Sequence, residues 1–282
     1  MNKNSEWEWE IKPQDRWFNL NLKDIVHYKD LLFRFVRRDI LISYQQTILG
    51  PVWVFLQPLL TTLVYFIIFT KVAKIPIGKI PPILFYLPGT ILWTYFSESL
   101  NATMNTFFAN AYIFRKVYFP RLITPIGAIL FHTFRLCIQL VLFLLVYAYF
   151  LFVKHEVTPS WWILSLPLLV VITAVFALGI GLLVSVFTAK YRDLDNILQF
   201  VLRLFMFAAP VVYPLSIVPE KYKFWFWLNP LTAVIETCRA AFFEPHIVHA
   251  KYLFLTIISV TVILFIGLVL FRKREIEVMD VI

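Results

Sequence analysis

Long apolar stretches without charged residues recur along the whole chain, and they constrain its fold more than any other feature. A helix needs about 20 predominantly apolar residues to cross the hydrocarbon core of a membrane. Of all residues, 60% are hydrophobic and 15% are charged, whereas soluble domains have about half and about a quarter. We therefore predict an all-α integral membrane protein.

Six membrane-spanning helices are predicted from these stretches. They cover residues 52–70, 83–105, 124–152, 162–187, 197–217 and 253–271. The second is the most polar of them, because it contains Glu98 together with two serines and two asparagines. Its polar side is therefore expected to face protein or water rather than lipid.

The basic residues predict how the chain is oriented in the membrane. Cytoplasmic segments of membrane proteins carry an excess of Lys and Arg. With six crossings both ends lie on one side, and the segments of that side carry twice as many Lys and Arg as the opposite segments. Both termini are therefore predicted to be cytoplasmic. This topology, rather than nucleic-acid binding, accounts for most of the net charge of +9.

The residues before the first crossing form a separate cytoplasmic N-terminal segment, residues 1–47, followed by the transmembrane domain, residues 48–282. Within the N-terminal segment, residues 28–47 place apolar side chains at helical spacing on one side. The opposite side carries Arg34, Arg37 and Arg38. This pattern predicts a basic amphipathic helix that lies in the cytoplasmic headgroup layer.

The stretch before the last predicted crossing, residues 218–252, is too apolar for a solvated connection. Asn229, Pro230, Glu236 and Arg239 interrupt it. Main chain of this kind is tolerated at membrane depth only where protein or a water-filled cavity satisfies its polar groups. We therefore predict a re-entrant helical hairpin near the mouth of a pore.

Sequence motifs for catalysis and for energy coupling are absent. The sequence has no GxxxxGK[ST] phosphate loop and no HExxH, CxxC or GxSxG motif. His246 and His249 are interpreted as a solvated loop pair rather than as metal ligands. Glu98 is the only carboxylate in a predicted crossing, whereas proton-coupled carriers use buried acidic or histidine relays. The chain therefore lacks an energy source of its own, which favours an external ATPase.

Two arginines lie inside predicted crossings, where charge is costly. Arg135 and Arg203 are each expected to pair, to snorkel or to line an aqueous path. The alternatives are a position near the membrane boundary or a structural tie between two helices. Pro210 and Pro214 break the fifth crossing, and together with Arg203 they favour this helix as part of a pathway.

Aromatic side chains of the first and fifth crossings are candidates for stacking on sugar rings. The alternative is ordinary helix packing and lipid contact. These side chains are Trp53, Phe55, Tyr65, Phe66, Phe205, Phe207 and Tyr213.

The inner segment NAYIFRKVYFPRL, residues 110–122, mixes apolar and basic residues. It is predicted to form a short surface helix that inserts into a groove of a cytoplasmic partner. The alternative is a positively charged connection that only fixes the topology.

Several short runs resemble one known family. They begin with RD at residues 38–39, YQQTILGPVW at 44–53 and QPL at 57–59. These runs resemble the N-terminal region of ABC-2 type permeases that export O-antigen, capsule and teichoic acid polymers. Three later runs follow in the order and spacing of that family, namely VYFPR at 117–121, KYRD at 190–193 and NPL at 229–231. The resemblance covers almost the whole chain beyond residue 25.

The resemblance implies a homodimer of six-span subunits in the bacterial cytoplasmic (inner) membrane. Two copies of a separate nucleotide-binding subunit would bind ATP and Mg²⁺, so this chain would hold no cofactor and no metal. The exported substrate would be a polysaccharide linked to undecaprenyl pyrophosphate. On this view the chain is a transport subunit and not an enzyme.

Together with the patterns above, the resemblance implies four groups of site residues. The lipid pyrophosphate would enter at Arg34, Arg37, Arg38 and Tyr44. The channel would be lined by Trp53, Phe55, Tyr65, Arg203, Phe207 and Tyr213. The outer gate, within residues 224–243, would include Trp225, Trp227, Asn229 and Glu236. ATPase coupling, within residues 110–121, would use Phe114, Arg115, Lys116, Tyr118 and Arg121.

Other functions remain open from the sequence. An ABC-2 exporter of drugs or small lipids would share most of these features. An intramembrane transferase acting on lipid-linked sugars would need convergent acid and base groups. Its best cluster is Arg192, Asp193 and Asp195, which fits a short cytoplasmic loop better. A passive channel or scaffold has no separate sequence signature.

Overall fold

The computed structural model describes residues 26–45, 47–78, 80–155, 160–191, 193–243 and 250–281, with side chains up to residue 275. Within these ranges the chain is helical and contains no strand. The N-terminal residues 1–25, Arg192 and the pair His246 and His249 lie outside the described residues.

The helices follow one another with short connections. Their bounds are α2 Lys29–Tyr44, α3 Val52–Tyr65, α4 Pro82–Met104, α5 Thr106–Phe114, α6 Ile123–Tyr149, α7 Leu166–Lys190, α8 Asp193–Ala208, α9 Glu220–Leu228, α10 Pro230–Phe243 and α11 Ala250–Val281. Shorter helical turns are Phe66–Val72 after α3, Phe150–Lys154 after α6, Trp161–Ser165 before α7 and Leu215–Ile217 after α8.

Four of these helical segments are long and apolar enough to cross a membrane. They are Val52–Val72, Ile123–Lys154, Trp161–Lys190 and Ala250–Glu275. They agree with the first, third, fourth and sixth predicted crossings, and they indicate a multi-pass membrane protein. The two other predicted crossings correspond to α4, which contains many polar residues, and to α8, which has 16 residues. A helix of that length extends only about 24 Å.

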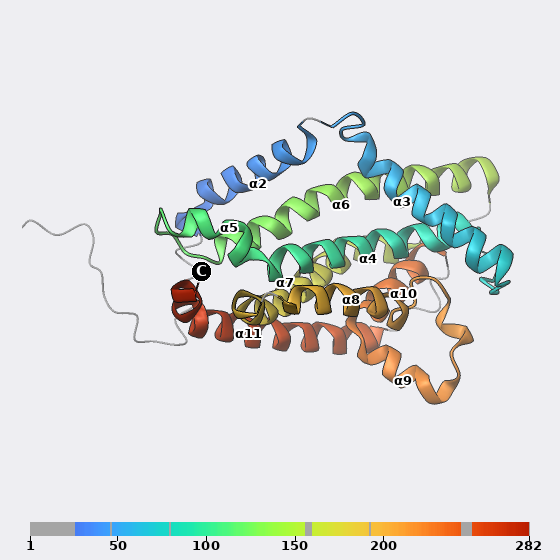
Figure 1. Cartoon of the computed structure of the whole chain (residues 1–282). Coiled ribbons are helices and arrows are strands. Elements are labelled where there is room, and N and C mark those ends of the chain that lie inside the picture. Colours follow the sequence, from blue (N-terminus) through green and yellow to red (C-terminus); the bar gives the residue numbers. More distant parts are fainter. Residues whose placement is uncertain are drawn as a thin grey trace, which may run out of the picture.

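Helix α4 lies at the centre of the bundle (Figure 1), in contact with α3, α6, α7, α8 and α10. Every residue from Leu84 to Trp93 is buried. A helix that is buried all round needs no apolar stripe, because each of its sides faces protein. The polar side chains follow from Thr94 onward and are partly buried. The sequence predicted that this side of the second crossing faces protein or water.

Helices α7 and α11 approach each other closely through glycine. A Cβ atom added to Gly267 would lie 2.5 Å from the carbonyl oxygen of Gly179. Small residues at such positions allow two helix backbones to come into contact.

Helices α2 and α5 and the end of α11 gather at one end of the bundle (Figure 1). Helix α2 lies along α6 and buries Leu32 and Phe35. Phe35 and Phe119 lie 5.7 Å apart between ring centroids, and Phe107 stacks on Phe271 of α11 at 5.1 Å. The predicted amphipathic helix is thus present, and its apolar side packs on protein.

Candidate functional site

A row of polar side chains follows one face of α4 at spacings of three and four residues. It consists of Thr94, Ser97, Glu98, Asn101 and Asn105. Residues at these spacings lie one above the other on a helix. Partners for this row come from α6 and from α8.

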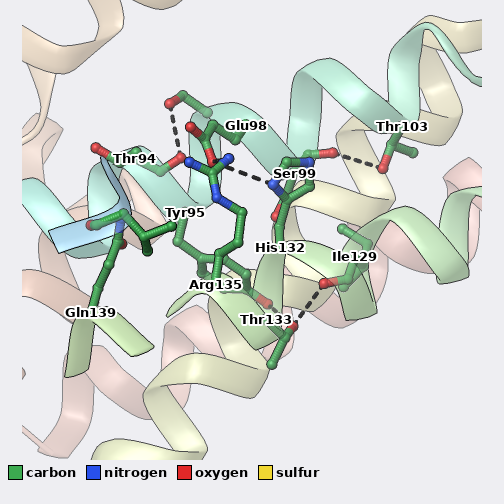
Figure 2. A network of polar contacts seen from close by, with 12 residues as sticks. Thr94, Tyr95, Glu98, Ser99, Thr103, Ile129, His132, Thr133, Arg135 and Gln139 are labelled. Carbon is green, nitrogen blue, oxygen red and sulfur yellow. Dashed lines mark hydrogen bonds and ion pairs between the residues drawn. The ribbon is translucent and has the colours of Figure 1, made fainter. Parts of the chain in front are cut away.

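On the side of the row that faces α6, Glu98 binds the guanidinium of Arg135. Arg135 Nη1 donates a hydrogen bond to Glu98 Oε2 at 2.7 Å, and His132 Nδ1 lies 3.3 Å from the same oxygen. Figure 2 shows both side chains of α6 directed at this carboxylate. Tyr95 and Thr133 share a hydrogen bond of 2.8 Å beside them. Arg135 therefore ties α6 to α4, which is one of the roles expected for a charged residue at membrane depth.

Toward α8, the row ends in a set of amide hydrogen bonds. Asn105 Nδ2 donates to Asp195 Oδ1 at 2.9 Å and to Asn101 Oδ1 at 3.0 Å. Gln199 Nε2 donates to the same Asn101 oxygen at 2.7 Å. Four side chains thus join the C-terminal end of α4 to the first two turns of α8.

A cavity of about 430 Å³ opens beside this polar face of α4. Its lining comprises Tyr65, Trp93, Ser97, Glu98, Asn101, Gln199, Leu202, Arg203, Met206 and Phe207. The wall combines a carboxylate, a guanidinium, two amides and several aromatic rings. Such a surface offers hydrogen-bond donors, acceptors and flat apolar faces, which are the groups that a sugar ring can engage.

Three of the six side chains predicted to line a channel meet in this cavity, namely Tyr65, Arg203 and Phe207. Trp53 and Phe55 lie near the start of α3 and are not part of its lining. Tyr213 follows the end of α8, and its hydroxyl donates to the Phe207 carbonyl at 2.5 Å. Of the other two aromatic candidates, Phe205 packs in the core 6.1 Å from the ring of Trp93, and Phe66 follows directly after α3.

Sequence reasoning did not assign Gln199, Ser97, Glu98 or Asn101 to the pathway. The signal for the last three was present, because the polar side of the second crossing was expected to face protein or water. Gln199 gave no such signal, since a single amide near the start of a helix is common on solvated surfaces.

A buried arginine holds the break after α8 together. Helix α8 ends at Ala208, so the carbonyl groups that follow lack partners within the helix. Arg239 of α10, with a 5% exposed side chain, donates to the carbonyls of Pro210 at 2.6 Å and Val211 at 2.7 Å. It also donates to the Phe85 carbonyl of α4 at 3.3 Å. The sequence predicted a cation of the outer re-entrant stretch at this position, but not its partners.

The predicted gate residues lie around α9 and α10. Glu236 accepts a hydrogen bond from Arg239 at 3.1 Å, and Trp227 stacks on Tyr252 of α11 at 4.2 Å. Asn229, between the two helices, donates to the Ala208 carbonyl at 3.2 Å. These contacts join α9 and α10 to α8 and α11. Trp225 is exposed and takes no part in them.

The arginines of α2 line one shallow groove together with Leu41, Ile42 and Gln45. Arg34 and Arg37 are exposed, whereas Arg38 pairs with Asp39 at 2.7 Å. Tyr44 does not line this groove. Its buried hydroxyl has no hydrogen-bond partner among the described residues.

The segment predicted for ATPase coupling, residues 110–121, comprises the second half of α5 and the exposed turn after it. Phe114 is buried and anchors this turn, while Arg115, Lys116 and Tyr118 are exposed. Lys116 donates to the Tyr112 hydroxyl. We call the exposed side chains of Tyr112 and residues 115–118 the basic turn.

Arg121 does not lie with the basic turn. It forms an ion pair of 3.4 Å with Glu275, and it donates to the Glu275 carbonyl at 2.9 Å. It therefore fastens the start of α6 to the end of α11.

Comparison with known proteins identifies the family. The family model for ABC-2 type transporters matches residues 30–243. The chain belongs to the ABC-2 type transporter family. This ABC-2 permease is a transport subunit and not an enzyme, and ABC-2 permeases work with a partner ATPase subunit.

The names of several relatives of this ABC-2 permease refer to the export or transport of polysaccharides. The O-antigen export system permease protein RfbA of Klebsiella pneumoniae is 26% identical over 247 residues, which cover 87% of this chain and 92% of the relative. RfbA of Myxococcus xanthus is 27% identical over 258 residues, covering 91% and 96%. The polysialic acid transport protein KpsM of Escherichia coli is 27% identical over 244 residues, covering 84% and 91%.

Proposed function

We propose that this ABC-2 permease forms the membrane path of an exporter for lipid-linked, O-antigen-like polysaccharide. The observation that carries the proposal is the cavity between α4 and α8, with the polar face of α4 on one wall and Arg203 and Phe207 on the other. The names of its relatives support a polysaccharide as the class of substrate.

The cavity suits a polymer that must move through it. Conduction requires contacts that are favourable enough for the substrate to enter and weak enough for it to leave. Amides and aromatic faces provide such contacts with sugar hydroxyl groups and ring faces. The single carboxylate of the wall, Glu98, is already bound to Arg135, so the guanidinium of Arg203 supplies the remaining charge of the wall.

In this proposal α4 and α8 complete six crossings, and both termini lie in the cytoplasm of the bacterial inner membrane. Helix α8 is short, and the segment up to Leu215–Ile217 extends it toward the outer side. Helices α9 and α10 form a re-entrant outer gate. Two copies of the chain form a homodimer that encloses the polymer path.

The two ends of the path have separate tasks in the proposal. At the cytoplasmic end, Arg34 and Arg37 of α2 are exposed and attract the pyrophosphate of an undecaprenyl-linked polymer through charge-assisted hydrogen bonds. The basic turn docks on two copies of the ATPase subunit, which bind ATP and Mg²⁺. In the proposal Glu98 serves as the partner of Arg135 rather than as part of a proton relay.

A deletion strain tests the class of substrate. Loss of the chain should remove the surface polysaccharide while lipid-linked chains accumulate inside the cell. Normal surface polymer together with increased sensitivity to drugs, or with altered membrane lipids, would contradict the proposal and favour the small-molecule alternative.

A further inference from the structure

The chain between α4 and α5 is bound to three other helices through three consecutive residues. The Met104 carbonyl accepts a hydrogen bond of 2.7 Å from Thr188 of α7. Asn105 Nδ2 donates to Asp195 of α8 at 2.9 Å. Thr106 shares a hydrogen bond of 2.9 Å with Thr124 of α6. We call Met104, Asn105 and Thr106 the α4–α5 junction.

Two of these three hydrogen bonds, those of Thr188 and Thr106, are buried. Thr188 and Thr106 are each 1% exposed. They satisfy polar groups at a helix end that would otherwise lack partners. Their role is accounted for by the fold.

The link from Asn105 is different, because it joins the two elements that the proposed function needs to connect. On one side, Asn105 precedes α5, a helix of nine residues that leads directly to the basic turn. On the other side, Asp195 lies in the first turn of α8. Arg203 follows eight residues later on the same helix, a distance of about 12 Å along its axis.

Both N–H groups of the Asn105 side-chain amide donate hydrogen bonds, one to Asp195 and one to Asn101. Asn101 also accepts from Gln199, so α8 is held to α4 at two points one turn apart. A displacement of α5 therefore acts on α8 through a hydrogen bond to a charged group, which is stronger than a neutral one.

We propose that Asn105 is a positioning residue that transmits the movement of α5, caused by the ATPase, to α8 and so to Gln199 and Arg203 in the cavity wall. This inference rests on the proposed function, because it assumes that the basic turn docks on an ATPase.

The decisive variants exchange the amide of Asn105 and the carboxylate of Asp195, singly and together. Asn105→Asp places two carboxylates against each other and breaks the link. The double variant Asn105→Asp with Asp195→Asn restores one amide and one carboxylate in reversed positions. Thr106→Val removes the neighbouring, more deeply buried junction link to Thr124 without touching α8, and it is the control.

The first measurement is the ratio of polymer exported to ATP hydrolysed by the full complex in vesicles. For Asn105→Asp we expect continued ATP hydrolysis and a fall of this ratio by about tenfold or more, since the lost bond involves a charged group. The double variant should recover most of the ratio, and Thr106→Val should keep it. An unchanged ratio for Asn105→Asp, or no recovery in the double variant, would overturn the inference.

The second measurement does not depend on the substrate. Spin labels at Ala109→Cys and Asn196→Cys, both exposed positions, report the distance between α5 and α8 with and without vanadate-trapped nucleotide, in a Cys137→Ala background. We expect a constant distance with Asn105 present and a change in Asn105→Asp. A change in the otherwise unaltered chain would overturn the inference. Failure of the unaltered complex to export polymer, with a constant distance, would contradict the proposed function alone.

Discussion

At the scale of single residues, Arg239 has the largest set of partners in the part of the chain around the α8 break. Its guanidinium binds three main-chain carbonyls and the carboxylate of Glu236, and it lies 3.8 Å from the centroid of the Phe85 ring. A guanidinium has five N–H donors in a fixed plane, which a lysine ammonium cannot imitate.

We predict that Arg239→Met destabilises the protein by about 3 kcal/mol or more, because it leaves buried carbonyls and Glu236 without their donor. Arg239→Lys should be intermediate, since it keeps the charge but only some of the bonds. Thermal unfolding of the purified permease in detergent measures the effect. Arg37→Met, at an exposed position of α2, is the control and should unfold near the original temperature. Equal unfolding temperatures for Arg239→Met and the control would refute the role of this clamp.

The ion pair between α4 and α6 permits a second prediction. Glu98→Gln and Arg135→Gln should each lower the free energy of unfolding by about 1–2 kcal/mol, as expected for a partly exposed pair within a membrane protein. The double variant should lose clearly less than the sum of the two, because the second change removes an already broken contact. A double-mutant cycle in the same unfolding assay measures this coupling, and strictly additive losses would argue against it.

The sequence predicted part of these residue contacts. The cost of Arg135 at membrane depth indicated that it needs a partner, and Glu98 was the only carboxylate in a predicted crossing. Their pairing depends on the register of α4 against α6, across 37 positions of sequence. Arg239 was expected as an outer cation within the re-entrant stretch, but its partners were not predicted, because they are main-chain carbonyls, which carry no sequence signal.

At the scale of elements, the basic turn is exposed while its base is anchored by Phe114 and Phe119 in the core. We predict that Arg115→Ala with Lys116→Ala leaves the permease folded but uncouples ATP hydrolysis from export. The lost charges lie on the surface proposed to dock the ATPase, so the amount of polymer exported per ATP should fall severalfold.

Lys74→Ala provides the control for this surface. Lys74 is equally exposed but lies in the connection between α3 and α4, at the other end of the bundle from α5 (Figure 1). Its replacement should leave export per ATP unchanged. A passive pore would respond neither to the double change in the basic turn nor to Lys74→Ala, and that outcome would contradict the role of the basic turn.

At the contact between α7 and α11, the substitution Gly267→Ala has two opposing effects on stability. Alanine in a helix is usually more favourable than glycine by about 1 kcal/mol. At Gly267 the added Cβ would meet main chain 2.5 Å away, and such overpacking costs about 1–3 kcal/mol. We therefore predict a net loss of stability for Gly267→Ala. Gly127→Ala, whose Cβ would find neighbours at 3.6 Å, should be tolerated. Thermal unfolding compares the two, and equal tolerance would be inconsistent with the close helix contact.

Element boundaries were predictable where the chain is uniformly apolar. The first predicted crossing, residues 52–70, agrees with Val52–Val72. The fifth, residues 197–217, does not agree in detail, because α8 begins at Asp193 and ends at Ala208. Its acidic first turn resembled a loop in sequence, although acidic residues favour the start of a helix. Pro210 and Pro214 correctly indicated a break, but not that Arg239 would hold it.

At the scale of the whole molecule, the bundle is arranged around α4, a long helix that carries a row of polar side chains. Helix α4 is not among the four helical segments that are apolar enough to be identified as membrane spans. It nevertheless lies in contact with α3, α6, α7, α8 and α10. The sequence showed that its polar side needs protein or water. It did not show that residues of α6 would bind the carboxylate on this side, or that residues of α8 would bind its amides. Which helix supplies which partner depends on tertiary contacts.

The central claim is that this permease provides a polymer path but no energy of its own. Vesicles that contain the permease alone, the ATPase subunit alone, or both, supplied with lipid-linked polysaccharide, test it most directly. We predict polymer translocation that requires both subunits and ATP and that vanadate abolishes. Translocation or ATP hydrolysis by the permease without the ATPase would contradict the claim.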